Sequence, residues 1–481
     1  MNYAKLRTRY VGTHCRLIAL LAASVIAGFC FPPQVRADDA KPVSNKQIDG
    51  NWLGTLRVGA IEMRLLFRIK KGDDGKLTAS GESIDQGTKD LVIETVTFAD
   101  NILTLKMPGM QATFIGKLLP DGDTIKGELE KGDKLPLELK RQTKEFTLTR
   151  PQLPSKPYPY LEDEITFPSK AKDVTLAGTF TRPKGKGPFV TVVLISGSGP
   201  QDRDEAVMGH KPFLVLADHL TRHGIAVLRY DDRGIAKSTG DFKTATSRDF
   251  ADDTSGAVTY LKARPDVGKI GLIGHSEGGI IAPMVATEGS DVAFLVLLAG
   301  QGTPGDVVML AQGQLIVKAM GGDEKTMARQ KSLQQKLFAV AKENDAAKKK
   351  LAVVDLEDGL SIAEKAAVRA QMTMVTGPWF TYFLSYDPRP TLGKVKCPIL
   401  ALNGDKDLQV PARENLAEIA RAAQAGGNLD VTVKELPGLN HLFQPAKTGL
   451  PFEYGKIETT FDPQALEIIS NWIAQRTGAG R

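Results

Sequence analysis

The stretch 270–279, with the sequence IGLIGHSEGG, constrains the fold more than any other part of this chain. Its apolar first half is typical of a short buried strand, and its glycines flank Ser276 in the pattern G-x-S-x-G. In that pattern a sharp turn joins a strand to a helix, and Gly274 and Gly278 stand where a Cβ would collide with nearby backbone. The turn exposes the serine hydroxyl beside the free N–H groups of the helix start. The stretch predicts a nucleophile elbow, although the motif alone also occurs by chance.

The first 37 residues have the pattern of a secretory signal peptide. Basic residues precede an apolar run at 17–31, and Val35-Arg36-Ala37 resembles a cleavage site. The run is too short for a comfortable membrane span, and no later stretch is apolar for long enough. We therefore expect 1–37 to be a signal peptide of an exported protein, periplasmic or secreted, whose mature chain has no stable membrane span.

Removal of this segment changes the charge balance. It holds five of the 62 basic residues and none of the 56 acidic ones, which leaves 57 against 56. Nucleic acid is therefore not an expected partner. Two of the three cysteines also lie in this segment, so the mature chain keeps only Cys397. We expect Cys397 to be a buried small hydrophobic residue rather than a nucleophile.

Residues 45–150 alternate short β-type runs with turn signals such as Asp73-Asp74-Gly75. The predicted strands are 52–58, 62–69, 76–80, 91–98, 102–106, 112–119, 124–130 and 135–139. This pattern indicates a separate all-β domain, most simply a meander closed into a barrel or a sandwich. Its residues suggest no chemistry.

A proline-rich linker at 151–160 precedes a different composition in 161–481. Two paired edge strands are predicted first, followed by Val/Ile/Leu-rich runs typical of strands that are buried on both faces. The predicted strands are 164–168, 174–181, 189–195, 225–230, 270–273, 294–298, 399–403 and 431–436, and the helices between them include 212–223, 247–264 and 412–425. This alternation predicts a doubly wound α/β domain.

The interval 302–392 interrupts the α/β alternation with a long stretch of helical spacing that is rich in Ala, Lys, Gln and Met. An insertion there would lie above the carboxyl ends of the strands, where such sheets bind ligands. We expect a helical cap, whose methionines and aromatic residues could line an apolar acyl pocket.

A serine nucleophile needs a base, and the base needs an orienting group. Of six histidines only His441 follows Ser276, and it lies in the loop after the last predicted strand. Two acids follow the preceding strand, Asp405 and Asp407, and we favour Asp407 because it is further from the strand end towards the site. His275, next to the nucleophile, is assigned a packing role.

Backbone N–H groups are the expected donors to a developing oxyanion. The first would be that of Glu277, directly after the nucleophile, and the second that of Ser198 in the glycine-rich loop 196–200. The neighbouring charged residues Asp202, Arg203, Asp204 and Glu205 either hold this loop by ion pairs or meet a polar substrate. The ion-pair interpretation is favoured.

Five motifs in this order resemble those of bacterial esterases of the α/β-hydrolase superfamily, in particular the serine-aminopeptidase-like hydrolases and their thioesterase relatives. They are SGSGPQDRDE at 196–205, RYDDRGIAKSTG at 229–240, IGHSEGG at 273–279, ALNGDKDLQVP at 401–411 and NHLF at 440–443. The resemblance implies an α/β-hydrolase fold and a triad of Ser276, Asp407 and His441. One position departs from the family pattern R-G-x-G-x-S, because Ala236 replaces its second glycine.

The resemblance implies hydrolysis of carboxylic esters of small or medium acyl groups through an acyl-enzyme, without a cofactor. An aminopeptidase or amidase, or a thioesterase, would use the same triad and stays open. A different class also stays open, in which the β domain binds envelope material and the hydrolase domain is regulatory or inactive. His219 and His223 stand four apart on a predicted helix, but no carboxylate or third histidine lies at ligand spacing, so no metal is expected. The sequence gives no indication of the oligomeric state.

Overall fold

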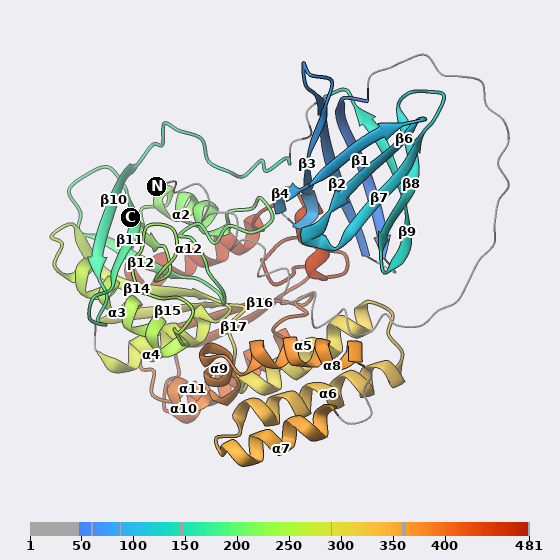
Figure 1. Cartoon of the computed structure of the whole chain (residues 1–481). Helices are drawn as coiled ribbons and strands as arrows, with labels where there is room; N and C mark the ends of the chain where they lie inside the picture. The colour runs from blue at the N-terminus through green and yellow to red at the C-terminus, as the bar shows by residue number, and fades with distance from the viewer. Residues whose placement is uncertain are drawn as a thin grey trace. The chain divides into compact units, whose positions relative to one another are not determined.

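The computed structural model describes residues 48–479, apart from 59–60, 87, 145, 147, 290 and 358–361. The expected signal peptide lies outside the described residues. The chain forms two compact units, and the smaller one combines the N-terminal segment up to Thr149 with the six residues Pro451–Lys456 (Figure 1). The larger unit comprises Arg150–Leu450 and Ile457–Arg481. Among the described residues, every helix is too short or too polar to cross a membrane.

The smaller unit is built on one antiparallel sheet of nine strands, in the order β4-β3-β2-β1-β9-β8-β7-β6-β5. The strands are β1 Gly50–Val58, β2 Ile61–Lys71, β3 Leu77–Ser83, β4 Thr88–Val92, β5 Thr95–Ala99, β6 Ile102–Met107, β7 Ala112–Leu118, β8 Thr124–Lys131 and β9 Asp133–Gln142, with short 3₁₀ helices η3 Ile84–Gln86 and η4 Pro108–Met110. Pairing of β1 with β9 joins the beginning of the meander to its end, so the sheet curls (Figure 1). Alternate side chains meet inside it, including the buried Trp52, Phe67 and Phe114.

The prediction of one strand at 91–98 is wrong. The chain leaves β4 after Val92 and begins β5 at Thr95, and the two strands pair with β3 and β6 at opposite edges of the sheet. Between them, Glu94 N already donates a hydrogen bond to Lys106 O. The break falls inside a continuous β-type run, so composition did not mark it.

The segment η5, Pro451–Lys456, packs within the smaller unit although it comes from the far end of the chain. A Cβ on Gly455 would lie 2.6 Å from Asp85 O, so glycine permits this close approach. Lys456 Nζ lies 3.3 Å from Glu62 Oε2. The smaller unit is therefore discontinuous in sequence.

The larger unit has an eight-stranded sheet in the order β10-β11-β13-β12-β14-β15-β16-β17. The strands are β10 Leu161–Pro168, β11 Thr175–Arg182, β12 Phe189–Ile195, β13 Ala226–Tyr230, β14 Val267–His275, β15 Val292–Leu298, β16 Ile399–Gly404 and β17 Val431–Leu436. β10 and β11 pair antiparallel, as predicted, and the strands from β13 to β17 are parallel. Parallel strands end at one edge of the sheet, so the loops after β12, β14, β16 and β17 meet there.

Helices cover both faces of this sheet (Figure 1). They are α2 Pro212–Arg222, α3 Ser247–Lys262, α4 Gly278–Glu288, α11 Ala412–Ala425 and α12 Pro463–Thr477. α2 and α12 bury Phe213, Leu220, Ile469 and Trp472 in one core with side chains of the central strands, and α3 and α4 lie on the opposite face. The predicted doubly wound arrangement is therefore present.

Six helices lie between β15 and β16, in the interval 302–392 for which the sequence predicts a helical insertion. They are α5 Gly305–Ala319, α6 Glu324–Lys342, α7 Ala346–Glu357, α8 Ile362–Val375, α9 Pro378–Ser385 and α10 Arg389–Leu392. Figure 1 shows α5 to α9 grouped in a layer of their own beside the sheet. That this layer caps a substrate site stays a prediction.

The proline-rich segment before β10 packs onto the larger unit and does not extend freely. Gln152 Oε1 accepts hydrogen bonds from Thr460 N and Phe461 N, and its Nε2 donates to Phe461 O at 2.7 Å. Leu153 packs against the core that α2 and α12 share.

Candidate active site

The turn between β14 and α4 has the geometry of a nucleophile elbow. Ser276 has a φ of 52°, in the left-handed region that residues with a side chain rarely adopt, and its N–H donates to Leu298 O at 2.8 Å. A Cβ on Gly274 would lie 2.0 Å from Gly278 O, and a Cβ on Gly278 would lie 2.2 Å from Ile195 O. Both glycines are required for the reason that the motif predicted.

His441 and Asp407 form a buried pair in the loops after β17 and β16. His441 Nδ1 donates to Asp407 Oδ2 at 2.7 Å, and both side chains are almost fully excluded from solvent. The other carboxylate oxygen of Asp407 accepts from Gln409 N and Val410 N. Asp405 instead accepts from Gly438 N in an exposed turn. Of the two candidate acids, the structure brings Asp407 to the histidine.

The residue before the nucleophile ties the elbow to the histidine loop. His275 Nε2 donates to His441 O at 2.9 Å, and the two imidazole rings lie 4.9 Å apart. His275 Nδ1 lies 2.7 Å from Glu205 Oε1 in a buried ion pair. Burial lowers the pKa of His275, but the charge and hydrogen bond of Glu205 outweigh this and leave the pKa raised. His275 thus does more than pack, because it fixes the backbone of His441.

The glycine-rich loop after β12, which contains Ser198, is held from beneath by two buried carboxylates. Ser196 Oγ and Gln201 N donate to the two oxygens of Asp232, at 2.8 and 2.9 Å. Gly197 N donates to Glu205 Oε1 at 2.8 Å. Burial raises the pKa of Asp232 well above its ordinary value. These bonds fix the loop in which the second oxyanion donor was predicted.

Glu277 directly follows Ser276 at the start of α4, and its side chain is buried. It is the N-cap residue of α4, and N–H groups at a helix start have no partner within the helix. Its carboxylate oxygen Oε1 accepts from Ser247 Oγ at 2.6 Å and from Trp379 Nε1 at 2.8 Å. Burial raises the pKa of Glu277 to about 7, although both hydrogen bonds act to lower it.

The ion-pair interpretation of the loop 202–205 is confirmed. Arg203 makes two short hydrogen bonds to Asp231 and also contacts Glu164. Asp204 pairs with Arg229 and with Lys211. Buried charges require such partners, and these hold the loop that carries Glu205.

Ala236, the departure from the family motif, has a φ of 47°. This is the conformation for which the family pattern supplies glycine, since a Cβ is strained there. The loop keeps its shape: Gly234 N donates to Thr239 O, and Ser238 N donates to Ile235 O. The alanine therefore strains the backbone at this position, while the hydrogen bonds that close the loop are retained.

Cys397 is partly buried, and burial raises the pKa of its thiol to about 11. A thiol with a raised pKa is a poor nucleophile, which agrees with the packing role expected for it.

Sequence reasoning missed two residues that support the site, Asp232 and Trp379, and it gave Glu205 an ion-pair role without identifying its partner His275. Glu205 and Asp232 lie in charged motifs that the sequence displays, but their partners come from other strands. Trp379 stood out only as part of an aromatic cluster, and nothing in the sequence linked it to Glu277.

Comparison with known proteins finds a family model and several hydrolases that this chain resembles. Residues 211–444 match the family model described as serine aminopeptidase, S33. The esterase EstD of Thermotoga maritima is 29% identical over 342 residues, which covers 69% of this chain and 72% of that protein.

Solved structures with a similar chain course include the esterase Pf2001 of Pyrococcus furiosus, at 15% identity and a TM-score of 0.41, covering 69% of this chain and 98% of that one. The proline iminopeptidase of Mycobacterium smegmatis shows 15% identity and a TM-score of 0.42, covering 66% of this chain and 100% of that one.

Proposed function

We propose that this chain is one of the serine-aminopeptidase-like (S33) α/β-hydrolases, whose family model matches residues 211–444, and that it is a serine esterase that cleaves carboxylic esters of small or medium acyl groups. The observation that carries this proposal is the buried hydrogen bond between His441 and Asp407 beside the elbow of Ser276. A histidine oriented in this way can serve as the general base for a serine nucleophile, which supports the proposal.

In the proposed reaction, Ser276 Oγ attacks the acyl carbon of the ester while His441 accepts the hydroxyl proton. Collapse of the tetrahedral intermediate breaks the bond to the alcohol, which takes that proton from the imidazolium and leaves an acyl-serine. A water molecule then attacks the acyl carbon with His441 again as base, and Ser276 is regenerated as the acid departs. Asp407 keeps Nδ1 of His441 protonated and stabilises its positive charge.

The oxyanion formed in both steps is held by the N–H groups of Glu277 and Ser198 in this proposal. The N-terminal end of α4 supports the first donor, because its dipole favours negative charge. The bonds from Ser196 and Gln201 to Asp232 support the second, because they fix the loop in advance of the reaction.

The insertion between β15 and β16 acts as a cap in this proposal. Its helix α9 contacts the residue next to the nucleophile through the bond from Trp379 to Glu277. Trp379 also stacks on Phe383, with ring centroids 5.0 Å apart. Such an aromatic cluster close to the elbow suits an apolar acyl chain.

An aminopeptidase would need carboxylates that are free to bind a substrate amine, and three of the acidic residues described in the insertion are engaged in other ways. Asp323 Oδ1 accepts from Thr326 N at the start of α6, and Asp345 accepts from Ala347 N and Lys348 N at the start of α7. Asp306 forms an ion pair with Lys342. These contacts favour an ester substrate over a free amino terminus.

The signal-like sequence of residues 1–37 supports a further part of the proposal, namely that the enzyme acts outside the cytoplasm. Coenzyme A thioesters are scarce there, so a thioesterase role is less suitable. N-terminal sequencing of the protein isolated from cell fractions would test export, with a mature N-terminus near residue 38 as the expected result.

The decisive experiment treats the purified protein with a fluorophosphonate probe and locates the adduct by mass spectrometry. We expect labelling at Ser276 that the Ser276→Ala variant loses. Initial rates on p-nitrophenyl esters of increasing chain length, compared with aminoacyl anilides, then define the substrate class. A folded protein that neither labels nor cleaves any ester would refute the proposal, and faster cleavage of the anilides would favour the aminopeptidase.

A further inference from the structure

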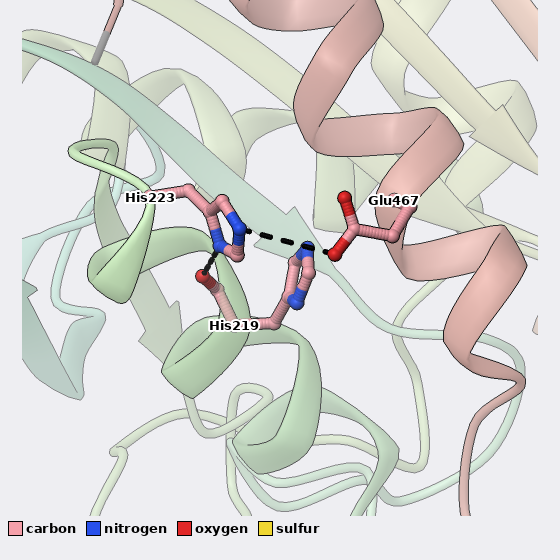
Figure 2. Close-up of side chains that lie close together, drawn as sticks. All are labelled: His219, His223 and Glu467. Atoms are coloured by element: carbon pink, nitrogen blue, oxygen red, sulfur yellow. Dashed lines mark hydrogen bonds and ion pairs between the residues drawn. The ribbon is translucent and has the colours of Figure 1, made fainter.

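A cluster of two histidines and a glutamate lies on the larger unit, on helices that carry no residue of the proposed triad (Figure 2). His219 and His223 are one turn apart at the C-terminal end of α2, and Glu467 projects towards them from α12. One potential ligand atom from each residue lies within 4.8 Å of the other two. No carboxylate lies at ligand spacing in the sequence, but the fold brings Glu467 to the histidine pair from a helix far along the chain.

The hydrogen bonds of His223 fix which of its nitrogens carries the lone pair. Its Nδ1 lies 2.7 Å from His219 O, and a carbonyl oxygen only accepts, so Nδ1 is the protonated nitrogen. In the neutral ring, Nε2 then presents a lone pair, and it lies 3.9 Å from Glu467 Oε1. Two acceptor atoms thus face each other at a distance too long for a direct hydrogen bond. A cation between them would satisfy both.

We propose that His219, His223 and Glu467 bind a divalent transition-metal ion of the Zn²⁺ class. Two imidazoles four residues apart on a helix, with one carboxylate, form a ligand set that Zn²⁺ uses in proteins, and a water molecule would complete the coordination. Ligand atoms lie about 2.0 to 2.2 Å from Zn²⁺, so two ligands of a tetrahedral site lie about 3.4 Å apart. Separations of up to 4.8 Å therefore have to close by as much as about 1.4 Å when the ion binds.

The surroundings permit this closure. The side chains of His223 and Glu467 are about half exposed, at 45% and 54%, so they can move without disturbing the core. His219 is more buried, and its Nε2, which faces α12, lies 3.0 Å from Ser470 Oγ, so metal binding through Nε2 would displace this hydrogen bond. The nearest basic side chain on the same helix, Arg222, is engaged by Asp218.

Such an ion would cross-link α2 to α12. The N-terminus of α12 is joined to the histidine loop, since Asp462 N donates to Phe443 O at 2.8 Å. The inferred role is therefore stabilisation of the larger unit, and it does not depend on the proposed esterase reaction. A ligand that binds only the folded state stabilises it by RT ln(1 + L/Kd), where L is the free ligand concentration, so the melting temperature rises with the logarithm of that concentration once it exceeds Kd.

The test uses the tag-free protein at about pH 8, where free imidazole is neutral. Co²⁺ is titrated first, because four-coordinate Co²⁺ with imidazole ligands absorbs strongly in visible light, and Zn²⁺ is then added in competition. We expect a single Co²⁺ site that Zn²⁺ displaces, and a higher melting temperature with Zn²⁺. His223→Ala and Glu467→Gln should each weaken Zn²⁺ binding at least about tenfold and abolish the thermal shift.

Glu458→Gln is the matched control, since Glu458 is another exposed glutamate outside the cluster. This variant should keep both the Co²⁺ spectrum and the thermal shift. Absence of four-coordinate Co²⁺ in the unmodified protein would overturn the proposal. So would Zn²⁺ binding that persists in both variants, which would assign the ion to other ligands such as His275 and His441. The circular dichroism of each variant verifies folding.

Discussion

Trp379 Nε1 donates a 2.8 Å hydrogen bond to Oε1 of Glu277, the residue that directly follows Ser276. This bond connects helix α9 of the insertion to the first residue of the nucleophile helix. The carboxyl group that accepts it is buried, and burial raises its pKa to about 7. The insertion and the elbow are therefore linked through a group that changes its charge near neutral pH.

Trp379→Phe removes the donor but keeps an aromatic ring against Phe383. We expect the free energy of unfolding to fall by about 1 to 2 kcal/mol, because a buried acceptor loses one of its two partners. The ester kcat/KM should fall as well, since α9 loses its contact beside the nucleophile. Trp472→Phe is the control, because Trp472 Nε1 has no hydrogen-bond partner among the described residues. Equal losses of kcat/KM in the two variants would contradict the role of this bond.

Glu277→Gln keeps both hydrogen-bond donors satisfied and cannot titrate. Between about pH 4.5 and 7, the unfolded carboxyl group has lost its proton while the folded one retains it, so stability falls as the pH rises. Relative to the variant, the natural protein should lose on the order of 3 kcal/mol across this range. Urea unfolding at several pH values measures the difference, and parallel pH profiles of the two proteins would show that Glu277 is already charged in the folded state.

Asp407→Asn and Asp405→Asn form a matched pair in one loop. Asp407→Asn should lower kcat by about 10³-fold or more, because the amide no longer holds His441 in the orientation and charge state required of a base. Asp405→Asn should retain most of the activity, since its carboxylate contacts only the turn at Gly438. Steady-state kinetics on one p-nitrophenyl ester compares kcat of the two variants. A larger loss of kcat in Asp405→Asn than in Asp407→Asn would assign the triad acid to Asp405.

Glu205→Gln removes the charge that faces His275 in the buried pair. We expect a loss of about 3 kcal/mol in stability, since breaking a buried pair leaves one charge without its partner. The raised pKa of His275 makes this stabilisation complete below the ordinary pKa of histidine, and it declines as the pH rises through the raised value. The loss should therefore be larger in acid than in alkaline buffer.

The same variant should lower kcat with little change in KM, because His275 positions the carbonyl group of His441. Asp204→Asn is the control, since it breaks an ion pair of the same loop with Arg229 and Lys211. A fall in kcat of similar size in the control would assign the effect to the loop as a whole.

Ala236→Gly restores the residue that the motif usually has. The left-handed conformation costs alanine about 1 to 2 kcal/mol, and the greater backbone entropy of unfolded glycine offsets about 0.5 to 1 kcal/mol of the gain. We expect a net stabilisation of about 0.5 to 1 kcal/mol in urea unfolding, with unchanged ester kinetics. A destabilised variant would show that the loop relieves the strain in another way.

The central strands of the larger unit could be predicted because strands such as β12 and β15 are mostly buried and rich in Val, Ile and Leu. β12 was predicted at 189–195 and is found there, and α11 has the predicted bounds. Chain order placed the acid in the loop after β16, and the greater distance of Asp407 from the strand end favoured it over Asp405. Local sequence and topology were sufficient for these features.

Features that depend on partners distant in the chain could not be predicted. The turn from β4 to β5 interrupts a continuous β-type run, and the sheet edges that decide it are visible only in the fold. Glu205 reaches His275, and Glu467 reaches His223, from elements that no spacing rule connects. Long-range contacts of this kind leave no periodic signal in the sequence.

Because the six residues Pro451–Lys456 complete the all-β unit, no single continuous segment of the gene encodes that unit. A fragment that ends near Thr149 lacks a part of its own fold, and a hydrolase fragment without the N-terminal segment keeps six residues that have lost their packing partners. Recombination at a single junction would leave both products incomplete. An exchange that replaces one of the units intact must therefore carry both of its pieces.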